Sequence, residues 1–121
     1  MFDKNGYPDE EALKAIATFD FGDKFLNLPS YLKLIRALWH WDDYFRYNEN
    51  TGCLELHTGG WSGNESIISA LQDHKYFWWV FWYKSKRGGH YWFEIYQWEP
   101  DGKIRKIPKI TQNGNSTKEN E

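Results

Sequence analysis

Cysteine is almost absent from this 121-residue chain, which holds Cys53 alone. A single cysteine excludes an internal disulfide and any metal site built from several thiolates, and it suits a reducing cytoplasm. The N-terminus lacks the basic segment and apolar run of a signal peptide. The longest apolar run, residues 76–83, is too short to cross a membrane as a helix. We therefore expect a cytoplasmic protein that does not interact with a membrane.

An excess of positive charge is also missing, since 15 Lys and Arg stand against 17 Asp and Glu, for a formal charge of −2. A protein that coats duplex nucleic acid normally needs a basic surface, so this function is excluded. Recognition of a single nucleotide remains open. Binding to another protein suits the acidic, aromatic-rich composition.

Aromatic residues are abundant: Trp, Tyr and Phe occur eight times each and make up 20% of the chain. Large rings serve equally as core, as interface anchors and as stacking surfaces for a ligand. The length predicts one domain over residues 1–110. Residues 111–121 contain no large apolar side chain, so the sequence predicts a disordered tail there.

Periodicity predicts helices after Asp9, after Pro29 and over residues 63–73, with the stripe from Tyr31 to Trp39 as the clearest. Alternation and turn residues predict strands at 44–47, 53–58, 76–83 and 90–98, and a short basic edge strand near Ile104–Lys106. The predicted fold is α+β, with the order ααββαβββ. Its sheet is mainly antiparallel, has four to five strands and carries helices on one face.

Two glycine-rich turns carry the candidate site. Residues 58–65 lead from a strand into a helix, where three glycines allow sharp turning and free N–H groups can meet an anion or a polar ligand. An alternative that needs no ligand is a capping box, in which the side chains of Ser62 and Glu65 satisfy backbone N–H groups at the start of the helix. The second turn, residues 87–90, adds positive charge if it lies nearby. The predicted ligand-binding residues are Gly59, Gly60, Trp61, Ser62, Asn64, Glu65, Arg87, His90 and Trp92.

The strand at residues 90–98 predicts a core face of Tyr91, Phe93 and Ile95. Its second face mixes aromatics with His and Glu, which is typical of a binding surface. Two alternatives for its cover stay open: the chain's own segments (the first helix or the linker with Phe19, Phe21 and Phe25) or a partner. The residues of this second face are His90, Trp92, Glu94, Tyr96 and Trp98.

The spacing of the candidate catalytic residues gives little support for an enzyme. Cys53 and His57 share a strand face but lie roughly 13 Å apart, too far for a hydrogen-bonded dyad, and the same distance separates His90 from Glu94. A site gathered from several strands (Glu55, His57, His90, Glu94) has no specific pattern in its favour. The four histidines lack zinc spacing. Ser62 lacks the parallel-strand context of a nucleophile elbow. We predict no catalytic residue, metal or cofactor.

The run Thr58–Glu65, the Trp- and Phe-rich segment and the run Arg87–Ile95 together resemble small uncharacterised proteins encoded by phages and prophages. The resemblance spans residues 39–95 and implies a location in the bacterial host cytoplasm and a host-directed role such as counter-defence. Three hypotheses follow. The first is a binding protein for a compact nucleotide-type ligand at the glycine turns. The second is an inhibitor that masks a host protein through Trp92, Tyr96 and Trp98. The third is a homo-oligomer with packed aromatic faces.

Overall fold

The computed structural model of the protein describes residues 1–110, and its α+β fold confirms the predicted class. The predicted tail at residues 111–121 lies outside the described residues. Within them the helices are α1 (Glu10–Thr18), α2 (Leu28–Leu38), α3 (Ser62–Asp73) and α4 (Phe77–Phe81). The strands are β1 (Phe45–Tyr47), β2 (Cys53–His57), β3 (Trp82–Lys86), β4 (His90–Glu94), β5 (Gln97–Trp98) and β6 (Arg105–Lys106).

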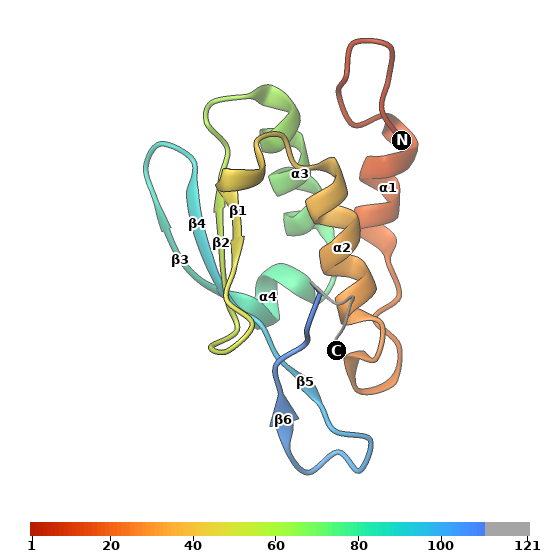
Figure 1. Ribbon diagram of the computed structural model, residues 1–121. Helices are drawn as coiled ribbons and strands as arrows, with labels where there is room; N and C mark the ends of the chain where they lie inside the picture. The colour runs from red at the N-terminus through yellow and green to blue at the C-terminus, as the bar shows by residue number, and fades with distance from the viewer. Residues whose placement is uncertain (111–121) are drawn as a thin grey trace, which may run out of the picture.

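The main sheet has the order β1-β2-β4-β3, and every neighbouring pair in it is antiparallel. Strands β5 and β6 form a separate two-stranded sheet that projects from the body of the protein (Figure 1). Helices α1, α2 and α3 gather on one side of the main sheet, with α4 below them. This arrangement leaves the other face of the sheet for the side chains discussed below.

The core forms between the helices and the inner face of the sheet, because the helices present apolar stripes and the strands alternate apolar with polar side chains. The predicted stripe of α2 is confirmed, since Tyr31, Leu32, Ile35 and Leu38 are all buried. Burying each such side chain stabilises the fold by roughly 1.5–3 kcal/mol. From the sheet the buried side chains are Phe45, Leu54, Leu56 and Phe93.

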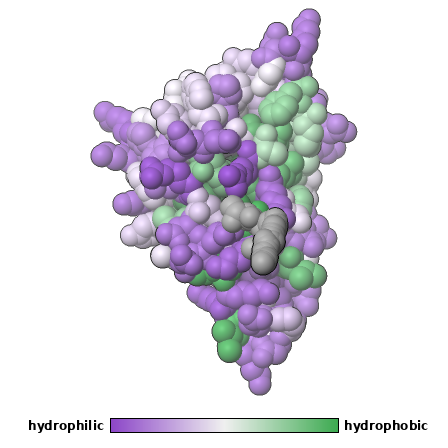
Figure 2. Space-filling model, viewed as in Figure 1, coloured by the Kyte–Doolittle hydropathy of each residue, from purple (hydrophilic) through white to green (hydrophobic). Residues whose placement is uncertain are grey.

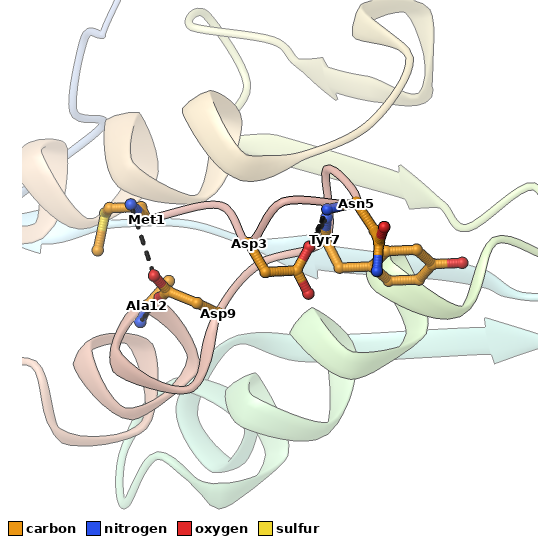
Figure 3. Close-up of polar contacts among 6 residues, drawn as sticks. All are labelled: Met1, Asp3, Asn5, Tyr7, Asp9 and Ala12. Atoms are coloured by element: carbon orange, nitrogen blue, oxygen red, sulfur yellow. Dashed lines mark hydrogen bonds and ion pairs between the residues drawn. The ribbon is translucent and has the colours of Figure 1, made fainter.

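The N-terminal segment is held in a compact loop before α1 (Figure 3). Asp3 accepts hydrogen bonds from the backbone N–H groups of Asn5 and Tyr7. Asp9 caps α1 as predicted, since its carboxylate accepts from the N–H of Ala12 at 2.8 Å. The Met1 amino group lies 3.6 Å from the same carboxylate. The loop therefore has its own turn chemistry and fixes the position of Tyr7.

The predicted strand at residues 76–83 is wrong in its first part, because residues 77–81 form the short helix α4. His74 explains the difference: its Nδ1 accepts from the N–H groups of Tyr76 and Phe77, so it satisfies donors at the start of the helix. Helical spacing then places Phe77 and Phe81 together in the core. An apolar run of this length fits a strand or a helix equally well by composition.

The predicted strand at residues 90–98 is also interrupted, since β4 ends at Glu94 and β5 begins at Gln97. The N–H of Ile95 donates to the carbonyl of Gly52, which ends the ladder. Gln97 then donates from Nε2 to the carbonyl of Phe25. As a result Trp98 packs edge-on against Phe25, on a part of the molecule different from that of Trp92. The predicted second face therefore keeps only His90, Trp92 and Glu94.

The linker between α1 and α2 packs into the core on the helical side. Phe21 is buried and stacks on His74 with ring centroids 4.3 Å apart. Phe19 contacts the ring of Tyr31. Helix α1 packs against α3. Of the predicted second face, the linker covers Trp98 through Phe25, while α1 packs on α3.

Candidate functional site

The two glycine-rich turns lie side by side at one end of the main sheet. The N–H of Thr58 donates to the carbonyl of Gly89 at 2.9 Å, and His57 is the cross-strand partner of His90. Gly89 has φ +84°, and a Cβ there would lie 2.1 Å from the Thr58 hydroxyl. Only glycine permits this approach without rearrangement.

The glycines of the first turn make room for aromatic rings. A Cβ on Gly59 would lie 2.5 Å from the ring of Trp41, and one on Gly63 would lie 2.3 Å from the ring of Trp61. Trp41 itself has φ +69°, an uncommon conformation for a bulky residue. Ring packing thus accounts for two glycines that the sequence associates with a ligand. Gly60 has φ +77° and open space around it.

Trp61 is half-buried between two neighbouring rings instead of standing free. Its ring centroid lies 4.9 Å from that of Tyr7 and 4.6 Å from that of His40. Trp61 also occupies the N-cap position of α3, without a side-chain cap. The predicted capping box is therefore wrong: Ser62 is already helical, and the N–H of Glu65 donates to the carbonyl of Trp61.

Asn64 is completely buried and uses its amide to tie two loops together. Its Oδ1 accepts from the N–H of His40 at 2.9 Å. Its Nδ2 donates to the carbonyls of His40 and Thr58. Because these groups satisfy the amide, Asn64 serves the architecture of the turn, and Trp61, Asn64 and Arg87 do not converge on one opening.

The outer face of the sheet holds a hydrogen-bonded chain of Glu55, His57 and His90. Glu55 Oε2 lies 2.7 Å from His57 Nε2, and the Nδ1 atoms of the two histidines are 2.6 Å apart. The antiparallel register produces this contact, because it pairs His57 with His90 directly. The sequence contains these residues, but only the strand pairing shows that they meet.

Trp92 lies on the same face, one cross-strand row away. It pairs with Glu55 in the register, and its ring stands perpendicular to that of His57 at 6.0 Å. The Lys84 ammonium lies over the Trp92 ring, 4.7 Å from its centroid. Arg87 is exposed in the β3–β4 turn, next to Lys86. Of the predicted binding residues, the structure thus places His90, Trp92 and Arg87 in one region.

A second surface was not anticipated, and it lies where α4 joins β3. Trp79 is 89% exposed, Trp82 45% and Tyr83 55%. We call these three residues the aromatic edge, since β3 is the end strand of the sheet order and all five of its residues are exposed. The apolar run at residues 76–83 contains these rings, but a predicted strand that is apolar on both faces does not show which of them are exposed.

A hollow of about 740 Å³ lies elsewhere, along β1 and the β1–β2 loop. Basic side chains of Arg36, Arg46 and Lys109 line it together with Glu49 and Glu55. The face shown in Figure 2 is mostly hydrophilic, with its hydrophobic side chains in separate patches. None of the nine predicted binding residues lines this hollow.

Cys53 lies on the outer face, opposite Glu94. Burial raises the pKa of its thiol, and the carboxylates of Glu55 and Glu94 raise it further, against the opposing effect of Lys84. The thiol is therefore a poor nucleophile. Over residues 1–110 no group of three or more His, Cys, Asp or Glu side chains is arranged to hold a metal ion.

In the same part of the chain, none of the helices has the length and apolar character needed to cross a membrane. Comparison with known proteins gives no match to a protein family, to a curated protein or to a solved structure.

Proposed function

We propose that this chain is a protein-binding module that masks a partner through the aromatic edge, Trp79, Trp82 and Tyr83. The observation that carries the proposal is the exposure of Trp79, which is 89% accessible although it lies within the helix α4. Trp and Tyr are among the residues that supply most binding energy in protein interfaces. Large aromatic side chains exposed on a protein surface mark candidate interaction sites.

The partner contacts the rings and does not add a strand to the sheet. Strand β3 carries Lys84 and Lys86, and its pairing with β4 shifts register between Trp82 and Lys84. Lysines and bulges are the devices that protect edge strands from unwanted pairing. The same lysines would face each other in an antiparallel pairing of two copies, which disfavours a dimer through this strand.

The basic side chains beside the rings favour an acidic partner surface. Lys84, Lys86 and Arg87 come soon after Tyr83 in the chain, and all are exposed. Opposite charge at the rim of an interface speeds association and selects the partner. The resemblance to phage-encoded proteins makes a protein of the bacterial host cytoplasm the natural candidate.

The proposal is tested by capture from bacterial lysate followed by titration of the purified captured protein. We expect 1:1 binding that weakens about thirtyfold or more in Trp79→Ala, because truncating an interface anchor costs about 2 kcal/mol or more. Leu26→Ala is the matched control, since Leu26 is also an exposed apolar residue (72%) but lies outside the aromatic edge. Equal affinity in both variants would refute the proposal.

Fewer observations support the binding of a nucleotide at the glycine turns than support the binding of a protein at the aromatic edge. The turns do lie together, but Trp61 and Asn64 are engaged in packing and hydrogen bonding. The groups that remain available near these turns belong to the outer sheet face, and they support a separate inference.

A further inference from the structure

We infer that the outer sheet face is a binding site for a nucleoside monophosphate, in which His90 and the β3–β4 turn hold the phosphate and Trp92 stacks on the base. The inference does not depend on the rings of the aromatic edge, although Lys84, Lys86 and Arg87 belong to both surfaces. It starts from the hydrogen-bonded chain of Glu55, His57 and His90.

Proton positions in this chain are fixed by its contacts. The Glu55 carboxylate accepts, so His57 carries hydrogen on Nε2. The short bond between the two Nδ1 atoms holds one further hydrogen, whichever ring it belongs to. When the histidine pair takes up one more proton, the only place left is His90 Nε2. In the protonated chain, this atom therefore donates a hydrogen bond away from His57.

The surroundings of His90 suit an anion. Lys86 is its cross-strand partner, and Arg87 follows in the turn. The Nε2 atom lies beside Gly88, where a Cβ would come within 3.2 Å of it. Glu55 already pairs with His57, and Glu94 lies at the opposite end of β4, facing Cys53. The charged side chains that adjoin His90 in the strand pairing and in the turn are therefore positive, which favours a phosphate, and the bound phosphate in turn favours the protonated chain.

Trp92 supplies the second half of the site. Its centroid lies 6.4 Å from that of His90, a span that one nucleotide can bridge between base and phosphate. Lys84 now covers the ring, but its side chain is exposed and can move to the phosphate. Stacking of a base on an aromatic ring contributes about 1–3 kcal/mol. The ring of Tyr44 also lies near His57, and the centroids of these two rings are 6.1 Å apart.

The test is calorimetric titration of the full chain with AMP and with inorganic phosphate, at pH 7, in buffers of low and high ionisation enthalpy. We expect AMP to bind with proton uptake, seen as an enthalpy that depends on the buffer. His90→Gln should weaken AMP about tenfold, the loss of one charge-assisted hydrogen bond. Trp92→Leu should weaken AMP and leave phosphate unchanged, and Lys103→Gln on the distant β5–β6 turn should leave AMP unchanged.

Circular dichroism establishes that each variant is folded. Absence of AMP binding by the wild-type protein overturns the inference whatever the variants do. Binding without proton uptake, or unchanged in His90→Gln, overturns the role of the histidine chain. Phosphate that binds as tightly as AMP overturns the assignment to a nucleotide.

Discussion

Single buried polar residues determine more of this structure than their number suggests, and His74 is the clearest example. The buried ring donates from Nε2 to the carbonyl of Phe19 at 2.8 Å and accepts two backbone N–H groups at Nδ1. These bonds require the neutral imidazole. Burial lowers the pKa of His74 below its ordinary value of 6.5, despite the opposing effect of the Phe19 carbonyl.

The lowered pKa of His74 predicts a pH dependence of stability. Between its folded pKa and 6.5, the unfolded chain binds more protons than the folded one. The stabilisation is therefore fully present above pH 6.5 and is lost as pH falls through the folded pKa. We expect the free energy of unfolding by urea to fall between pH 7 and pH 5 more steeply in the wild type than in His74→Gln. Parallel curves for the two proteins would contradict this role.

Asn64 predicts a large loss of stability on truncation. Asn64→Ala removes the partner of the His40 N–H and carbonyl in a partly buried site, while the Thr58 carbonyl keeps the N–H of Trp61, and we expect a loss of about 1–3 kcal/mol in the free energy of unfolding. Asn50→Ala, on the exposed β1–β2 loop, is the control and should change stability by less than about 0.5 kcal/mol. Urea denaturation measures both, and similar values for the two variants would be inconsistent with the bridging role.

Cys53 predicts slow thiol chemistry. Because its pKa is raised by burial and by nearby carboxylates, the thiol reacts several-fold more slowly with a disulfide reagent at pH 8 than in the urea-unfolded chain. Glu94→Gln removes a neighbouring negative charge and should increase the rate. Lys84→Gln removes the one opposing charge and should decrease it. A slower reaction in Glu94→Gln together with a faster reaction in Lys84→Gln would show that this electrostatic description is wrong.

Among the elements, the turns and strand registers determine which side chains meet. The β3–β4 turn approaches β2 so closely that Gly89 has a special role. We expect Gly89→Ala to destabilise the protein by about 2 kcal/mol or more, from the left-handed backbone and the clash with Thr58 together. Gly60→Ala is the matched control: its φ is also positive, but no atom lies within 4 Å of the added Cβ.

The Gly60→Ala variant should therefore lose only the backbone contribution, about 1–2 kcal/mol. Thermal unfolding of both proteins separates the steric effect from the backbone effect. Equal destabilisation would contradict the close approach of Gly89 to Thr58.

Helices and their caps are predicted well from this sequence, whereas the points at which a predicted strand is interrupted are not. The stripe of α2 and the cap at Asp9 are local patterns, and both are confirmed. Residues 77–81 read as a strand because a short apolar run carries no period of its own. The deciding interaction comes from His74, whose role depends on contacts with Phe19 and Phe21 across the core.

For the whole molecule, the hairpins and the helical stripes suffice to predict an antiparallel sheet with helices on one side, and the structure has this fold. The candidate surfaces depend on longer-range facts. The histidine chain requires the pairing of β2 with β4, and the aromatic edge requires α4 to turn Trp79 outward. Residue types are visible in the sequence, whereas their cross-strand neighbours and their exposure are products of the tertiary structure.

Site-specific photo-crosslinking in bacterial cells tests the central claim most directly. A benzophenone amino acid replaces Trp79 in one protein and Leu26, the exposed control, in another. We predict that the probe at position 79 gives one discrete adduct with a protein of different sequence, and that the probe at position 26 gives none. No adduct from position 79, the same adducts from both positions, or an adduct only with a second copy of this chain would contradict the account.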